Sequence, residues 1–157
     1  MVLRKLFVTL SLSVVAASGL TSTGISPASA SDQPESCRPE YTANGWDVNI
    51  CIDGDSTWPY PQLWARGKVI GNPVSCTFKV YLVDVNGTLV RSSSAQDCTK
   101  VGWVRSPMAS DADLPAAPAS WNIAPPARAM FVAWDSSGTK VLTIQSNLMD
   151  AYGNTHP

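Results

Sequence analysis

The segment CTFKVYLVDVNGTLVRSSSAQDC, which runs from Cys76 to Cys98, decides how the rest of the chain is interpreted. Two runs of β-forming residues flank the pair Asn86-Gly87, and a cysteine lies at each outer end. Asn-Gly between alternating apolar residues is a strong hairpin signal, because both central residues of a type I′ turn need a positive φ. The pattern therefore predicts a hairpin closed at its base by a disulfide. A turn centred on Gly87 would bring Cys76 and Cys98 opposite each other.

The first thirty residues have the pattern of a secretory leader. Arg4 and Lys5 precede the apolar run LFVTLSLSVVAA, and Ala28-Ser29-Ala30 fits the small-residue rule for signal-peptidase cleavage. The apolar run is shorter than the roughly 20 residues that a membrane-spanning helix needs. We therefore expect a signal peptide over residues 1–30 and one secreted, extracellular domain over residues 31–157.

The charge of this domain excludes some classes of partner. The chain has 11 Lys and Arg and 12 Asp and Glu. Two of the basic residues lie in the leader and all the acidic ones follow it, so residues 31–157 carry a net charge of −3. The sequence has no basic run that would neutralise phosphates or attach to an anionic membrane surface. Neither nucleic acid nor a membrane is expected as a partner.

All four cysteines lie after the leader, and an even number in an exported chain indicates disulfides. Three pairings are possible, and we predict Cys37–Cys51 and Cys76–Cys98 because each pair brackets its own hairpin. A zinc site is the alternative. It is disfavoured because there is no CxxC motif and the only histidine is the penultimate residue, His156.

The remaining chain has the pattern of short strands. Residues 46–53 alternate apolar and polar side chains after a predicted three-residue loop, Ala43-Asn44-Gly45. Further strands are expected at 62–70, 101–105, 128–135 and 139–146, and residues 108–126 form a proline-stiffened connection. We predict an all-β fold: a small antiparallel, immunoglobulin-like β-sandwich of seven to eight strands with two local disulfides. The Cys…Trp…Cys pattern of antibody domains is absent, so the likeness to immunoglobulins is one of architecture only.

The sequence offers no catalytic group that is clearly positioned. A serine or cysteine nucleophile needs a nearby base, and the only imidazole lies in the C-terminal tail. The carboxylate pairs Asp53/Asp55 and Asp111/Asp113 are better explained as turn residues, although Asp53/Asp55 could also supply oxygen ligands to calcium. We expect no enzymatic activity and no cofactor.

Six tryptophans are the main excess in the composition. Trp46, Trp103 and Trp134 lie in predicted strands and are interpreted as core residues. Trp58, Tyr60 and Trp64 cluster around two prolines, which makes them a possible binding surface for a protein or a sugar. The alternative is that they cap one end of the sandwich.

The pattern GWDVNICIDG, then WPYPQLWARG, then the Cys76–Cys98 hairpin resembles a class of small exported actinobacterial proteins with two disulfides. The resemblance covers residues 46–98. Adaptor subunits of umbrella toxin particles have a similar size and build, and there an adaptor joins a lectin-like subunit to a toxin. Two consecutive local disulfides are also similar to those of the proteinaceous α-amylase inhibitors. This chain lacks their Trp-Arg-Tyr tripeptide and is longer after its last cysteine.

These observations favour a non-enzymatic, secreted protein-binding module, an adaptor or structural subunit of an extracellular complex. Its partner would be another secreted protein, either a lectin-like or toxin subunit or a hydrolase. One alternative is an inhibitor of an extracellular hydrolase that uses residues 55–62 or 106–119. Another is a carbohydrate-binding module that uses Trp58, Tyr60 and Trp64.

Overall fold

The computed structural model of the protein describes residues 33–57, 59–100 and 102–156. The chain separates into two units, Met1–Ala30 and Ser31–Pro157, and all described residues belong to the second. The predicted leader and Trp58 lie outside the described residues. Among those that are described, no helix has the length and apolar character needed to cross a membrane.

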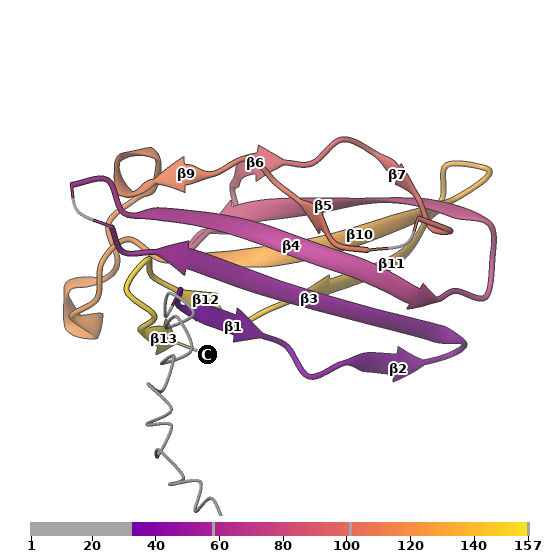
Figure 1. Ribbon diagram of the computed structural model, residues 1–157, viewed down its shortest axis with the longest axis horizontal. Helices are drawn as coiled ribbons and strands as arrows, with labels where there is room; N and C mark the ends of the chain where they lie inside the picture. The colour runs from indigo at the N-terminus through magenta and orange to yellow at the C-terminus, as the bar shows by residue number, and fades with distance from the viewer. Residues whose placement is uncertain (1–32, 58, 101, 157) are drawn as a thin grey trace, which may run out of the picture. The chain divides into compact units, whose positions relative to one another are not determined.

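Four long strands form the centre of the fold: β3 (Trp46–Asp55), β4 (Gln62–Gly71), β5 (Cys76–Asp84) and β10 (Ala127–Asp135). β3 pairs with β4 in one antiparallel sheet, and β5 pairs with β10 in the other. Figure 1 shows the first pair in front of the second. Their facing side chains form one buried core, to which Ile50 and Leu63 contribute from one sheet and Phe78 and Phe131 from the other. The predicted all-β sandwich is confirmed.

The outer strands of both sheets are each broken in two. β1 (Glu35–Cys37) and β2 (Tyr41–Ala43) pair with β3, while β8 (Val104–Arg105) and β9 (Ala109–Ser110) pair with β4. β6 (Leu89–Ser92) and β7 (Gln96–Asp97) pair with β5, and β11 (Lys140–Gln145) and β12 (Leu148–Met149) pair with β10. β13 (Thr155–His156) adds to β12. Short edge strands resist edge-to-edge association with other chains.

Three of the breaks are made by buried serines in the same way. Ser93, Ser106 and Ser146 each follow the first half of a broken strand and are 4–6% exposed. Each donates its N–H to a backbone carbonyl of the long strand, and its Oγ accepts the N–H of that same residue. Each hydroxyl then donates to the carbonyl of the next residue. The hydroxyl thus replaces a backbone acceptor and lets the edge strand leave the ladder without an unpaired buried amide.

Counting each broken strand once gives eight strands besides β13 in the described part of the chain, which agrees with the predicted seven to eight. Their order is β1/β2–β3–β4–β8/β9 in one sheet and β11/β12–β10–β5–β6/β7 in the other. Immunoglobulin constant domains instead have the order A-B-E-D and C-F-G. The likeness is therefore one of two-layer architecture, as the sequence indicated.

Both Asn-Gly turns differ from their predicted geometries. At Asn44-Gly45 both φ angles are positive, and Ala43 pairs directly with Trp46, so this loop has two residues rather than three. At Asn86-Gly87 only Gly87 has a positive φ, and a three-residue loop joins Asp84 to Thr88. The reason is the Asp84 carboxylate, whose Oδ1 accepts the N–H groups of Asn86 and Thr88 and holds the longer loop.

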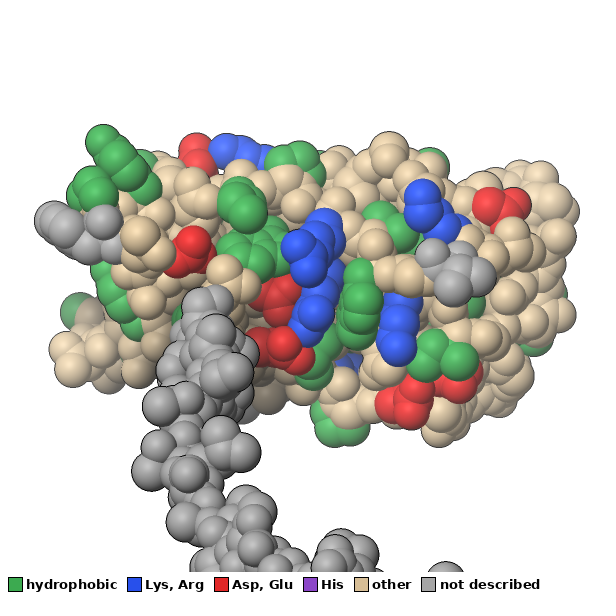
Figure 2. All heavy atoms as spheres, in the orientation of Figure 1, with side chains coloured by type: hydrophobic (Ala, Val, Ile, Leu, Met, Phe, Trp, Pro, Cys, Tyr) green, Lys and Arg blue, Asp and Glu red, His purple; other side chains and the backbone are tan. Residues whose placement is uncertain are grey.

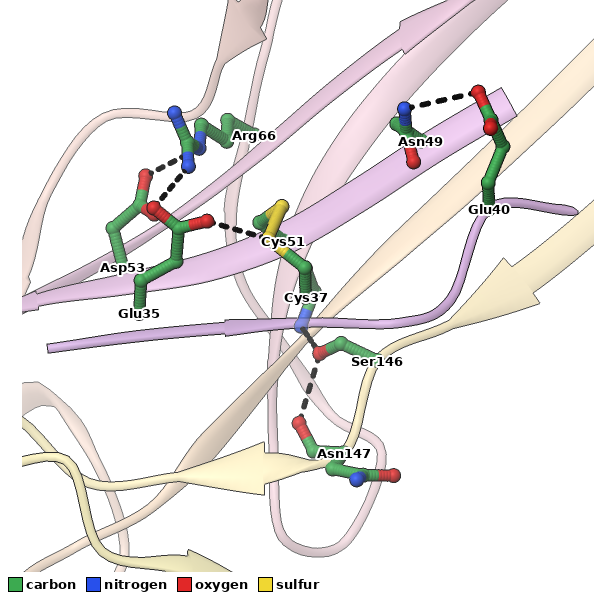
Figure 3. The surroundings of a disulfide bond; sticks show 10 residues. Glu35, Cys37, Glu40, Asn49, Cys51, Asp53, Arg66, Ser146 and Asn147 are labelled. Atoms are coloured by element: carbon green, nitrogen blue, oxygen red, sulfur yellow. Dashed lines mark hydrogen bonds and ion pairs between the residues drawn. A yellow bond between two sulfur atoms is a disulfide. The ribbon is translucent and has the colours of Figure 1, made fainter. Parts of the chain in front are cut away.

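Both disulfides join the predicted cysteine pairs. Cys37 lies opposite Cys51 in register with β3, and the N–H of Cys98 donates to the carbonyl of Cys76 at 2.9 Å. Cys51 lies between the core residues Ile50 and Ile52 on the outer face of β3, but it is only 1% exposed. Figure 3 shows the bridge joining the short strand that carries Cys37 to the long strand that carries Cys51.

Gly67 in β4 has a packing role. A Cβ at this position would lie 3.0 Å from Val80 and 3.4 Å from Phe131, both in the opposite sheet. A side chain at this position would therefore meet the opposite sheet.

Candidate binding sites

The structure separates the three aromatic residues that were predicted to form a surface. Tyr60 is exposed, with 74% of its side chain accessible, whereas Trp64 is 4% exposed. Trp58 lies outside the described residues. Trp64 is therefore too buried to belong to the candidate surface. Trp103, which was assigned to the core, is 37% exposed instead, while Trp46 is a core residue as predicted. Because Val104 faces the core, its neighbours Trp103 and Arg105 face outward.

A first concave surface lies at the end of the sandwich where β4 begins. This loop-end pocket has a volume of about 280 Å³ and is lined by Pro59, Tyr60, Pro61, Ser110, Asp111, Ala112 and Tyr152. The two segments predicted to form inhibitory loops, 55–62 and 106–119, meet in it. Tyr152, which is 49% exposed, comes from a C-terminal segment that the sequence analysis left unassigned.

Asp150 holds the loop-end pocket together. Its side chain is fully buried, and Oδ1 accepts the N–H groups of Tyr152 and Asn154 at 3.0 and 2.9 Å. Oδ2 accepts the Asn154 Nδ2–H and also the Ala124 N–H at 3.1 Å. One carboxylate thus fixes the turn that carries Tyr152 and ties it to the long proline-rich connection.

The Asp150 turn belongs to a motif that occurs three times. Asp84, Asp135 and Asp150 are each followed three residues later by a glycine with φ between 80° and 89°. In each turn the aspartate N–H donates to the carbonyl of the residue four positions on, and Oδ1 accepts amides two and four positions on. The pattern D-x-x-G-[T/N] can be found in the sequence alone. It identifies the turn at residues 150–154, which sequence reasoning missed.

Among the described residues that line the loop-end pocket, Asp111 is the only one with a carboxylate. Its Oδ1 is buried and has no hydrogen-bond partner in the described part of the chain. Burial raises the pKa of the Asp111 carboxyl, and the negative charge of Asp150 raises it further. Asp113, predicted to pair with it, turns away to accept the Ser110 N–H and to bind Arg91 at 3.0 Å.

The possible calcium ligands Asp53 and Asp55 already have other partners. Asp53 is 5% exposed and binds Arg66 at 3.0 Å, while Asp55 accepts the N–H and O–H of Thr57. Burial raises the pKa of Asp53, which the positive charge of Arg66 opposes; the Thr57 donors lower the pKa of Asp55. Another group of ligand-type side chains, Glu35 with Cys37 and Cys51, offers no thiolate because both sulfurs form the disulfide.

His156 does not lie in a loose tail, as was expected, but in β13. Its ring stacks on Trp121, with ring centroids 3.8 Å apart and an angle of 10° between the planes. The stack fastens the C-terminal strand to the proline-rich connection. The histidine therefore contributes to packing.

A second concave surface lies on the outer face of the β3–β4 sheet, toward the other end of β4. This basic groove has a volume of about 470 Å³ and is lined by Lys68, Val69, Ile70, Asn72, Cys98, Thr99, Lys100, Gly102 and Trp103. Figure 2 shows that Lys and Arg side chains gather on this face, next to a hydrophobic side chain. Sequence reasoning missed the groove because its residues come from separate segments and form no run.

Trp103 is packed between the groove and a buried ion pair. The guanidinium of Arg66 lies 4.4 Å from the ring centroid and the Lys68 ammonium 5.1 Å from it. Arg66 also binds the carboxylates of Glu35 and Asp53, as Figure 3 shows. These contacts connect β1, β3 and β4 to the segment before β8. They hold Trp103 in place as one wall of the groove.

No protein-family model matches the chain, and a comparison with curated proteins gave no significant match.

Proposed function

We propose that the protein is an exported, non-enzymatic binding module that joins proteins in an extracellular complex, as an adaptor or structural subunit. The observation that carries this proposal is the presence of two concave surfaces of different chemistry at the two ends of one strand. The loop-end pocket contacts the start of β4 at Pro61, and the basic groove contacts Lys68–Ile70. At about 3.3 Å per residue, the two surfaces are separated by about 25 Å. A module of this kind can contact two partners at once.

The loop-end pocket supports the proposal through its composition. Exposed tyrosines on a stiff backbone are typical of protein-binding surfaces, since they bury a large area at low entropic cost. Tyr60 lies between two prolines, and the Asp150 turn holds Tyr152. Two disulfides in a small domain support an oxidising, extracellular location, in agreement with the predicted leader.

Inhibition of an extracellular hydrolase is a second candidate function. It is favoured by the meeting of residues 59–61 and 110–112 in one pocket. Tyr60, at 74%, is the most exposed large hydrophobic residue in the described part of the chain. A panel of secreted proteases and glycosidases measured with and without the protein would distinguish this function from the adaptor role. A sugar-binding role has less support, since Trp64 is buried.

The adaptor proposal is tested by purifying the protein from the medium of the organism that makes it. We expect a second chain in a fixed ratio by size measurement. The Tyr60→Ala/Tyr152→Ala variant should recover it at less than about a tenth of the unaltered level, because hot-spot tyrosines dominate such interfaces. Leu89→Ala is the control. Leu89 is 55% exposed, but it belongs to β6, in the sheet of β5 and β10, and is not among the residues that line the pocket. A monomer without any companion chain contradicts the proposal.

A further inference from the structure

The basic groove combines positive charge with exposed apolar side chains. Lys68 and Lys100 are among its lining residues, and no acidic residue is. Arg66 and Arg105 pair across β4 and β8 beside it, so four of the nine basic residues after the leader gather on this face. Arg66 is already paired with Glu35 and Asp53. The local positive charge is therefore that of the groove lining, which has two lysines in a domain that is negatively charged as a whole.

The apolar part of the groove is large enough to hold a side chain. Ile70 is 51% exposed and Trp103 37% exposed, and both line the groove together with Val69 and the Cys76–Cys98 disulfide at Cys98. Such side chains are normally covered in a stable protein, and exposed apolar residues framed by polar ones mark interaction sites. Lys68 and Lys100 line the same groove, and the Lys68 ammonium lies 5.1 Å from the centroid of the Trp103 ring.

We propose that the basic groove binds an extended acidic peptide segment of a partner protein, with an apolar side chain seated between its carboxylates. The inference rests on the proposed function and names the chemistry of one partner. The carboxylates would contact Lys68 and Lys100, while an aliphatic side chain packs on Ile70 and Trp103. Complementary charge of this kind directs association and selects the partner.

Two other classes of ligand, sugars and phosphates, fit the groove less well. A sugar would need a free aromatic face, but Arg66 and Lys68 both lie over the Trp103 ring. A phosphate group is best held by an arginine fork, but the Arg66 guanidinium is already bound by Glu35 and Asp53. Neither ligand would use the exposed surface of Ile70. The peptide uses both the charge and the apolar floor.

The probe is a fluorescent heptapeptide with a central leucine and two acidic residues on each side of it, titrated against the purified, disulfide-bonded full chain. We expect saturable binding that weakens with added salt. A peptide with serine in place of leucine should bind about tenfold more weakly, since it loses the apolar contact. A peptide with glutamine in place of the acidic residues should show no binding.

Lys100→Glu should weaken peptide binding about tenfold, because it reverses a charge at the groove. Lys140→Glu makes the same change on an exposed lysine of β11 and should stay within about twofold. Equal effects of the two variants, or no binding of the leucine peptide, overturn the inference. Displacement of the peptide by polygalacturonate or inorganic phosphate at lower concentration than by the unlabelled peptide also overturns it, since the ligand would then be an acidic sugar or a simple anion.

Failure of this inference is distinguishable from failure of the adaptor proposal. If a companion chain is recovered through Tyr60 and Tyr152 but the peptide does not bind, only the inference about the groove fails. If the peptide binds but the protein is always recovered alone, the adaptor proposal fails.

Discussion

The loop-end pocket and the basic groove are built in opposite ways. The pocket collects three segments from distant parts of the sequence, and one buried carboxylate, Asp150, fixes the turn that carries Tyr152 and binds the Ala124 amide. The groove has neighbouring strands as its base, a disulfide at its edge and Arg66 and Lys68 stacked on Trp103. The comparison shows that the turn carrying Tyr152 depends on one buried carboxylate, while Trp103 in the groove is held by two cations from β4.

The largest effect should follow from removing the carboxylate at the loop end. Asp150→Ala leaves four hydrogen bonds without an acceptor in a fully buried place and should lower the free energy of unfolding by about 3–5 kcal/mol. Asp135→Ala removes the equivalent carboxylate from an exposed turn and should cost much less. Urea denaturation compares the two variants. Equal losses would show that Asp150 is only one turn residue among three.

An intermediate effect is expected at the groove. Arg66→Gln leaves Asp53 buried without its cation and should lower the free energy of unfolding at pH 7 by about 2–3 kcal/mol. Burial already raises the pKa of Asp53, and without Arg66 the folded-state pKa rises further above the unfolded value. A carboxyl with a raised folded-state pKa loses its contribution to stability as the pH rises through that pKa. The penalty should therefore shrink as the pH falls toward about 3.5.

Denaturation of the Arg66→Gln variant at pH 7 and pH 3.5 checks this sign. The same substitution in an Asp53→Asn background is the control, because an amide cannot ionise. There the penalty should be smaller and should depend less on pH, because Glu35 is the only carboxylate left among the two that pair with Arg66. A penalty that is the same at both pH values in the single variant would contradict the role assigned to the ion pair.

The smallest effect concerns the wall of the groove at Thr99 and Lys100. The Thr99 hydroxyl and amide both donate to Asp97 and lower the pKa of its carboxyl. A lowered folded-state pKa gives stability that is present above the unfolded value, near 4, and is lost as the pH falls through the folded value. Asp97→Asn should therefore speed amide exchange at Thr99 and Lys100 at pH 7 and have little effect near pH 2. Asp55→Asn removes the same kind of carboxylate, which accepts the Thr57 amide and hydroxyl at the end of β3 in the other sheet, and should leave the Thr99 and Lys100 amides unchanged.

Local patterns predicted much of this fold correctly. Alternation of apolar residues located β3, β4 and β10, and the cysteine spacing gave both disulfides, since each pair closes a nearby hairpin. The turn geometries differed from those predicted because Asn-Gly permits both a two-residue and a three-residue loop. The neighbouring Asp84 side chain selects one of them at residues 85–87. The assignments of Trp64 and Trp103 were wrong because both residues lie on the outward face, where covering by other segments decides exposure.

The sequence by itself determined the class of this protein: a disulfide-braced, all-β domain preceded by the pattern of a secretory leader. These features depend on neighbours within one hairpin or one strand, so short stretches of the sequence are enough to specify them. Only the tertiary structure decided where binding surfaces form. Residues 59–61, 110–112 and 152 meet because the sheets bring three loops to one end, and Lys68 meets Lys100 and Trp103 because β4 pairs with β8. Contacts between such distant segments are set by strand order, which no single stretch of the sequence encodes.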